Sequence, residues 1–442
     1  MSTNLREIRA LSRLAWPVVV AQLGALGMGV VDTLMVGRLG EQSLAAVAVA
    51  NALSVALFVF PAHIATGLDP VMSQAFGAGR PIDAGRTAFR GLVLMTLVGL
   101  PVMALHGYGD PLLRLMQQPE EIIALGASYV WMVGWSMLPL FWFGMVRQHL
   151  QSRGMMLPGT VAILVANAVN IVANAALIYG LWGAPALGVM GSAIATVLAR
   201  VTMLVVLHAV AWRALREVWP GAAGLFDPRA LWRLLLQGVP VGFQIGVEVW
   251  AFVSTSFLMG LLGTTAVAAH SIAMSLGTAT FAIPLGIGAA ASTRVGNLLG
   301  AGGDWARAGW LSVALGVGVM SVSAATFTLF PEAFVTSFTT DPQVVALGVS
   351  LMPFLAAFQM FDGAQVTLFG VLRGAGDTNM PMVVNLIGWW LVGIPVAWGS
   401  ALYFDLGPQG VWVGLALGLA VVATLLTVRL RYTVRRGGFL VG

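Results

Sequence analysis

Three carboxylates lie deep inside apolar stretches of this 442-residue chain. Glu248 falls near the middle of the apolar residues 240–263, and Asp32 and Asp362 occupy two other stretches of the same kind. A charged side chain at the bilayer centre costs roughly 2.5–3.5 kcal/mol on insertion scales, and burial disfavours the ionised form of an acid. Such groups bind a proton or a cation readily, so we predict that all three serve in cation binding and coupling. The alternative is an acid that only hydrogen-bonds a neighbouring helix for packing.

The acids at 248 and 362 form a possible pair. If their two stretches pack together, Glu248 and Asp362 could share one proton, or they could surround one hard cation such as Na⁺ with oxygen ligands. The sequence leaves both options open.

Amides and hydroxyls accompany the third acid, Asp32. Asn170 and Asn174 are four residues apart in one apolar stretch, and Ser192 and Thr196 have the same spacing in the next. Residues four apart share a helix face, so we expect a polar network in the N-terminal half. Asn, Ser and Thr also join membrane helices by hydrogen bonds, and the sequence favours neither interpretation.

A few larger side chains could line a substrate cleft. Trp389 and Trp390 are able to contact flat aromatic cations through their ring faces, although Trp at this depth more often packs or forms an interfacial belt. Gln22 and Gln244, each in the first apolar stretch of its half of the chain, complete the cleft candidates.

The composition defines the class of protein. The chain is 59% hydrophobic and 9% charged, with a mean hydropathy of +0.90, whereas soluble proteins carry about 25% charged residues. It therefore spans a membrane many times. The absence of Cys excludes disulfides and Cys-based metal sites. No phosphate-binding loop, nucleophile elbow or metal-ligand cluster is visible, so we expect no cofactor and coupling to a gradient of Na⁺ or H⁺ rather than to ATP.

Twelve apolar runs of about 20 residues predict twelve transmembrane helices. They centre near Gly24, Ala56, Thr96, Val133, Val169, Leu198, Val249, Ser275, Val319, Phe358, Trp390 and Leu419. The arginines gather at the N-terminus, at the C-terminus and in alternate loops, which places both termini in the cytoplasm of a bacterial-type inner membrane. The basic residues behind the net charge of +5 therefore lie in alternate loops and not in one basic stripe, which argues against nucleic-acid binding.

Prolines and glycines recur at a constant offset of 223 residues. The pairs in this register include Pro17 and Pro240, Gly40 and Gly263, Pro61 and Pro284, Pro158 and Pro381, and Gly191 and Gly414. Each half holds six helices, so both halves have the same orientation and are related by a pseudo-twofold axis along the membrane normal. We predict an all-α integral membrane protein with two six-helix bundles, residues 1–212 and 234–442, that face each other across a central cleft. Residues 213–233 would form a cytoplasmic linker.

Several motifs together resemble the multidrug and toxic compound extrusion (MATE) family, and within it the NorM-like branch. They are VDTLMVGRLG in the first span, LDPVMSQAFGAG after the second, GVPVGFQIGVE in the seventh and FDGAQVTLFGVLRGAGDTNMP from the tenth onward. The resemblance implies that Glu248 and Asp362 belong to a Na⁺ or H⁺ site, and that the network around Asp32 is protonated in the N-terminal lobe. Some relatives place a Tyr one turn before the second acid, where this chain has Phe358, which supplies no oxygen.

The resemblance implies a cation-coupled antiporter, not an enzyme, that exports amphipathic and often cationic drugs by alternating access. We expect a monomer whose partners are small organic molecules and the lipid bilayer. The nearest alternative is a flippase or exporter of lipid-linked or polar metabolites on a related fold. A major-facilitator carrier lacks support because its charged motif after the second span is not visible, and a membrane enzyme would need a catalytic constellation near one interface.

Overall fold

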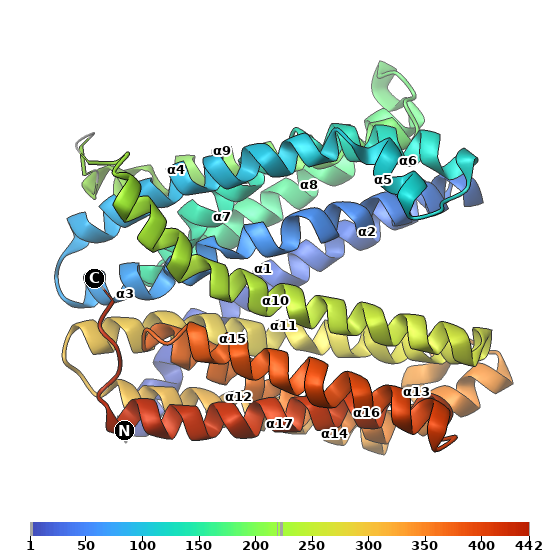
Figure 1. Ribbon diagram of the computed structural model, residues 1–442. Helices are drawn as coiled ribbons and strands as arrows, with labels where there is room; N and C mark the ends of the chain where they lie inside the picture. Colours follow the sequence, from blue (N-terminus) through green and yellow to red (C-terminus); the bar gives the residue numbers. More distant parts are fainter. Residues whose placement is uncertain (1–2, 219, 222–223, 442) are drawn as a thin grey trace. The chain divides into compact units, whose positions relative to one another are not determined.

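The computed structural model describes residues 3–218, 220–221 and 224–441, and the regular secondary structure in these ranges is entirely helical (Figure 1). The helices of the N-terminal half are α1 (Thr3–Gly37), α2 (Glu41–His63), η1 (Ala65–Leu68), α3 (Asp69–Gly77), α4 (Pro81–His106), α5 (Gly109–Leu115), α6 (Glu120–Gly134), α7 (Met137–Ser152), α8 (Leu157–Tyr179), η2 (Leu181–Gly183) and α9 (Val189–Glu217). Those of the C-terminal half are α10 (Pro228–Leu262), α11 (Thr264–Gly300), α12 (Trp305–Leu329), α13 (Pro331–Thr336), α14 (Pro342–Gly374), α15 (Asn379–Leu386), η3 (Ile387–Gly393), α16 (Ile394–Trp398), η4 (Gly399–Tyr403) and α17 (Gly407–Arg435).

The helices are long and apolar enough to span a membrane repeatedly. Among the described residues, 11 helical segments pass by length and composition, and the pair α6 and α7 supplies a twelfth if it counts as one span. That pair bends by 45° at its break, close to the centre expected near Val133. The all-α membrane fold predicted from the apolar runs is confirmed.

The internal repeat is visible in the backbone as well as in the sequence. Gly40 and Gly263, which are 223 positions apart, precede α2 and α11 with φ angles of +114° and +111°. A side chain is strained at such angles, so glycine is needed at both helix starts. The helices that end there, α1 and α10, each contain 35 residues. The duplication therefore preserved helix lengths and turn geometry together.

The chain forms two compact units whose borders fall inside helices. Unit 1 contains residues 1–19 and 243–442, and unit 2 contains residues 20–242. The sequence placed the border at 213–233 instead, a stretch whose residues 219, 222 and 223 lie outside the described ranges. The two observed borders follow Pro17 and Pro240, and a proline inside a helix removes a backbone hydrogen bond.

Direct contacts explain why the first part of α1 belongs to unit 1. The carboxylate of Glu7 accepts hydrogen bonds from Nε and Nη2 of Arg294 at 2.7 and 2.8 Å, and Ala15 packs in a small core with Ile287 and Ala290. The first part of α10 likewise belongs to unit 2, where Gly238 lies against the backbone of Ile64.

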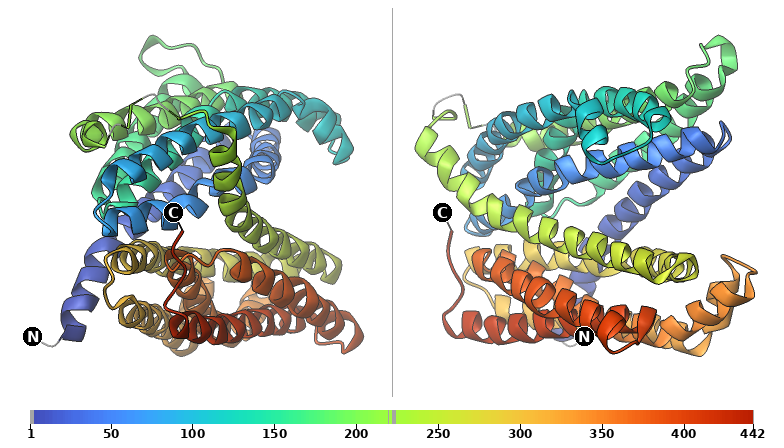
Figure 2. Two further views of the ribbon diagram at one scale, coloured as in Figure 1. Left: turned by 60° about the vertical axis from the view of Figure 1, so that its left-hand side comes forward. Right: turned by 45° about the vertical axis from the view of Figure 1, so that its right-hand side comes forward.

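Within unit 1, α14 is the central helix and packs against α11, α12 and α17. Gly370 and Gly374 of α14 lie directly against the backbone of Gly288 and Ser292 in α11, so the absence of a side chain permits the close approach. In unit 2 the corresponding contacts join α8 with α9, α4 with α7 and α2 with α6. The helices of each unit run side by side in both views of Figure 2.

The eleventh span departs from regular α geometry. It is built from α15 and α16 with two π-helical segments, η3 and η4. π turns are rare and often accompany functional sites. The first of them follows Asn385 by two residues and contains both Trp389 and Trp390.

Candidate functional site

The two acids of the C-terminal half come together through α10 and α14. Oε1 of the half-buried Glu248 accepts a hydrogen bond from Nε2 of Gln365 at 3.1 Å. Gln365 is three residues after Asp362 on α14, and Asp362 is only 4% exposed. The hydrogen bond to Gln365 therefore joins α10 and α14 close to both acids, and a proton or cation shared by Glu248 and Asp362 stays a prediction.

Amide groups complete this arrangement, which we call the carboxylate site (Glu248, Asp362, Gln365 and Asn385). Asn385 of α15 donates Nδ2 to the carbonyl of Gln244 at 2.9 Å and lies within hydrogen-bonding reach of Glu248. Its Oδ1 and the Oε1 of Gln365 are buried and accept no hydrogen bond from any described residue. Buried polar atoms are normally satisfied, so these two oxygens stand out.

The donor set of the carboxylate site fits a hard cation. Two carboxylates and two amide oxygens are the ligand types that hard cations prefer. Of the ion pairs formed among the described residues, none involves Glu248 or Asp362. The same two acids could instead hold one shared proton, because like charges close together cannot both ionise easily.

The aromatic residues beside this site belong to a packed core. Trp389 is fully buried with its ring centroid 5.1 Å from that of Phe252, and Phe358 lies 5.8 Å from Trp412. The burial of Trp389 differs from the expected role in lining a cleft. Trp390 is 37% exposed, and its Nε1 donates to the carbonyl of Val247 at 3.2 Å.

The two glutamines expected in the cleft differ in exposure. Gln22 of α1 is partly exposed, whereas Gln244 of α10 is 7% exposed and holds Asn385 through its backbone carbonyl. Gln244 thus positions a member of the carboxylate site through its main chain.

A second polar cluster surrounds Asp32 in unit 2. Asn174 donates Nδ2 to Oδ1 of Asp32 at 2.5 Å and to Oδ1 of Asn170 at 3.1 Å. Asp32 is 6% exposed, and both asparagines are fully buried. Asn170 and Thr196 also lie within hydrogen-bonding reach of the Asp32 carboxylate. We call these four residues the asparagine network, which contains three of the four polar residues expected near Asp32: Asn170, Asn174 and Thr196.

Ser192 is placed differently from the prediction. Its carbonyl accepts the hydroxyl hydrogen bond of Thr196 at 3.0 Å, but its own buried Oγ has no hydrogen-bond partner among the described residues. Tyr129, which the sequence did not single out, extends the network: its hydroxyl donates to Oδ1 of Asn51 at 3.2 Å and interacts with Thr196.

Sequence reasoning also missed a basic residue at membrane depth. Arg200 lies near the middle of α9, and its Nη1 donates to Oγ of the fully buried Ser136 at 2.8 Å. Its guanidinium sits 5.7 Å from the ring centroid of Phe58, and its charge acts on Asp32. The signal was visible, because Arg200 is two residues from the expected span centre at Leu198.

Ser136 links this arginine to the break between α6 and α7. It is the residue that precedes α7, and its Oγ donates to the carbonyl of Val133 at 2.6 Å. Through Ser136, Arg200 of α9 therefore contacts the break between α6 and α7.

Comparison with known proteins places this arrangement in a family. The MatE family profile matches residues 17–176 and 240–398, which together cover most of the chain and reproduce the two repeats. The chain belongs to the MatE family.

Individual MatE relatives agree over almost the full length. A "Probable multidrug resistance protein NorM" of Mesorhizobium japonicum is 34% identical over 451 aligned positions, covering 96% of this chain and 93% of the relative. The "Multidrug resistance protein NorM" of Burkholderia vietnamiensis is 35% identical over 430 positions, covering 95% and 92%. The resemblance drawn from the motifs is confirmed.

Solved MatE structures share the fold across the chain. The eukaryotic MATE transporter AtDTX14 superposes with a TM-score of 0.88 at 25% identity, covering 99% of each chain. An outward-facing multidrug resistance MATE family transporter gives 0.87 at 19% identity, with the same coverage. The family is one of transporters rather than enzymes.

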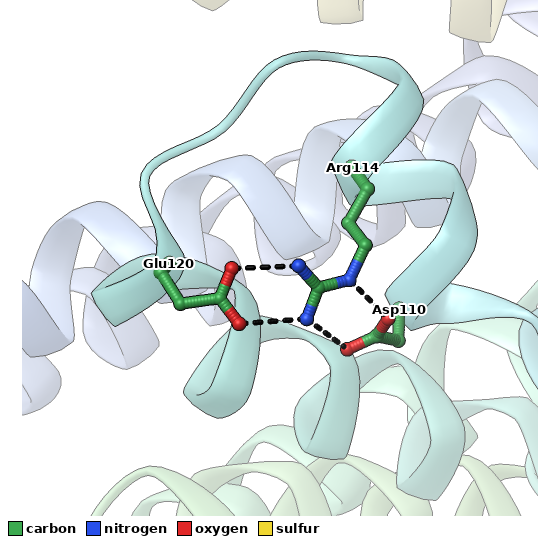
Figure 3. A network of polar contacts seen from close by, with 3 residues as sticks. All are labelled: Asp110, Arg114 and Glu120. Atoms are coloured by element: carbon green, nitrogen blue, oxygen red, sulfur yellow. Dashed lines mark hydrogen bonds and ion pairs between the residues drawn. The ribbon is translucent and has the colours of Figure 1, made fainter.

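Charges outside the spans of this MatE chain behave differently from the buried ones. Arg114 binds Asp110 through Nε at 2.7 Å and Glu120 through Nη1 and Nη2 at 2.6 and 2.7 Å (Figure 3). Arg114 donates all of these hydrogen bonds. They lower the pKa of Glu120 and raise the pKa of Arg114. All three side chains are at least half exposed, so the cluster contributes little to stability.

Proposed function

We propose that this chain is a cation-coupled antiporter that exports amphipathic, often cationic, organic compounds by alternating access. The observation that carries the proposal is the carboxylate site, in which Glu248 hydrogen-bonds Gln365, three residues from Asp362, and neither acid has a basic ion-pair partner among the described residues. Both acids ionised would leave two uncompensated negative charges in a low-dielectric interior, so uptake of a proton or a cation is strongly favoured.

The coupling ion would be Na⁺ or H⁺, and the residues suit either. Na⁺ would bind the carboxylates of Glu248 and Asp362 with the amide oxygens of Gln365 and Asn385, while H⁺ would be shared by the two acids. In the N-terminal lobe, protonation of Asp32 would release the charge-assisted hydrogen bond from Asn174. Each event would alter the helix contacts that its residues make.

Exchange follows if the two ligands favour different states. The ion would favour one conformation and the organic compound the other, and the free-energy difference between these preferences is the coupling. The prolines at the unit borders in α1 and α10 give these helices weak points where such a change could occur. No nucleotide is required.

The choice of multidrug compounds as substrates is supported by the names of the NorM relatives. The arginine distribution supports a bacterial-type inner membrane with both termini in the cytoplasm, and twelve spans place both termini on one side. We further propose that each transport unit is a monomer.

Transport from proteoliposomes tests this function. Purified protein is reconstituted with a fluorescent organic cation inside, and Na⁺ and H⁺ gradients are imposed separately. Inward movement of at least one ion should drive export of the compound, and Glu248→Gln and Asp362→Asn should abolish the gradient-driven part.

Export that ignores both gradients, or equal activity of wild type and both variants, would defeat the antiporter proposal. Movement of a lipid-linked substrate, with none of the organic cation, would favour the flippase alternative instead.

A further inference from the structure

A divided apolar groove lies on unit 2, between α4, α7 and α9. Its two pockets have volumes of about 330 and 610 Å³ and share Phe89, Leu92 and His208 as a common wall. Volumes in this range hold a small amphipathic molecule. None of the residues lining either pocket belongs to the carboxylate site or the asparagine network.

The last turns of α9 form one side of the groove. His208, Trp212 and Arg216 succeed one another at intervals of four residues and therefore lie along a single helix face. Trp212 is 60% exposed and Arg216 is also exposed, so this side is open to the surroundings. A cationic side chain thus stands at the mouth of an otherwise apolar pocket.

A buried histidine points to a polar ligand. His149 of α7 lines the smaller pocket, is 2% exposed, and contacts the ring of Phe76 at 5.4 Å. Neither of its ring nitrogens has a hydrogen-bond partner among the described residues. Burial of an imidazole without partners is unfavourable, whereas a ligand oxygen in the pocket would satisfy it.

The segment before α10 and the first turn of α10 line the larger pocket. Nε and Nη2 of Arg90 donate to the carbonyl of Gly224 at 3.0 and 2.8 Å, which fastens this segment to α4. Leu225, Phe226 and Leu231 then contribute to the pocket lining. Arg90 thus ties the residues that line one side of the larger pocket to α4.

We propose that this groove binds one anionic phospholipid of the surrounding membrane. An acyl chain occupies each pocket, the phosphate lies near Arg216 and His208, and the glycerol ester oxygens reach His149. Two apolar compartments that meet at His208, with Arg216 lining one of them, match a molecule with two chains joined at a polar centre. A cationic drug would meet the like charge of Arg216, which disfavours the groove as a drug site.

Native mass spectrometry of the full-length protein in mild detergent tests this proposal. The probes are phosphatidylglycerol and phosphatidylcholine with identical acyl chains. One phosphatidylglycerol should remain bound with about tenfold preference, because phosphatidylcholine carries the same phosphate together with a cationic choline group that Arg216 repels. Arg216→Gln should remove the preference, and Leu92→Trp should remove binding of both lipids by filling the shared wall. Arg431→Gln, at an exposed arginine of α17 that lines neither pocket, is the matched control.

Thermal unfolding of His149→Leu supplies an independent readout. Because its imidazole has no partner, the variant should unfold at the same or a higher Tm without lipid, yet gain less Tm from added phosphatidylglycerol than wild type. A purely structural histidine would lose Tm in both conditions, which would count against the proposal. Equal retention of the two lipids, or an Arg431→Gln loss as large as that of Arg216→Gln, would show ordinary surrounding lipid only and overturn it.

Discussion

The two polar sites of this protein differ in their charge balance although they lie in duplicated scaffolds. The carboxylate site of unit 1 holds two acids and amides, while the asparagine network of unit 2 holds one acid with Arg200 nearby. Fully ionised, the first carries two uncompensated negative charges and the second is balanced. Under the proposed function, uptake of a cation or proton is therefore required at the carboxylate site and optional at Asp32.

The repeat shows that this difference arose after duplication. At the offset of 223 residues, Glu248 corresponds to Ala25 and Asp32 corresponds to Thr255. The positions that set helix packing and turns were kept, as Gly40 and Gly263 show, whereas those of the buried acids were not. A duplicated membrane scaffold can thus carry two unlike polar sites.

The largest effect should come from neutralising the carboxylate site. Glu248→Gln and Asp362→Asn should each reduce gradient-driven transport by roughly 100-fold, since coupling free energies of about 1–3 kcal/mol correspond to about 5–150-fold. Drug export from proteoliposomes measures the effect. Glu332→Gln, an exposed acid of α13, should behave as wild type. If gradient-driven transport survived in both variants, the carboxylate site would not be the coupling site.

Removal of the positive charge in unit 2 should have the next largest effect. Arg200→Gln leaves Asp32 without compensation and Ser136 without its donor, and should lower the free energy of unfolding by about 1–3 kcal/mol. Adding Asp32→Asn should recover part of this loss, which a double-mutant cycle of thermal unfolding measures. Arg213→Gln, at an exposed position of the same helix, is the control. Strictly additive losses would mean that Arg200 and Asp32 do not balance each other.

A smaller loss is expected from the asparagine network. Asn174→Ala removes the amide that donates to Asp32 and should lower transport about tenfold, in line with the roughly 1.5–3 kcal/mol of a hydrogen bond to a charged group. Asn167→Ala is a close control, because its amide donates to the backbone carbonyl of Gly24 instead. Equal effects of the two substitutions would indicate that the network only joins helices.

The exposed cluster of Figure 3 should respond least. The pKa of Glu120 is lowered below its ordinary value of 4.5 by its hydrogen bonds to Arg114, so the contribution is complete above pH 4.5 and is lost as the pH falls further. Glu120→Gln should leave transport unchanged and lower Tm only slightly at neutral pH, and this Tm difference should disappear on acidification, when the wild-type carboxylate is protonated. A transport defect at neutral pH would extend the importance of charge beyond the buried sites.

Much of the fold could be predicted because membrane helices appear in the sequence as apolar runs of about 20 residues. The acids were found for the same reason, since a charge inside such a run is conspicuous. Gln365 and Asn385 were missed because neutral amides are ordinary in membrane helices until a structure shows them beside a carboxylate. The burial of Trp389 depended on the side chain of Phe252, a contact that spacing alone does not reveal.

The unit borders could not be read from composition. Residues 19 and 20, like residues 242 and 243, lie within continuous apolar helices, so no polar or flexible segment separates them. Pro17 and Pro240 lie just before the two borders. Proline is also common inside ordinary membrane helices, so these residues alone did not predict the borders.

The contact between Glu7 and Arg294 has a consequence for biogenesis. These residues are 287 positions apart, and a ribosome that adds about 5–20 residues per second needs roughly 15–60 s to make the intervening chain. Throughout that interval the first residues are synthesised and inserted without their partners. Unit 1 therefore assembles from segments that are synthesised first and last, residues 1–19 and 243–442. The N-terminal segment must remain free to pack until α11, which carries Arg294, has been inserted.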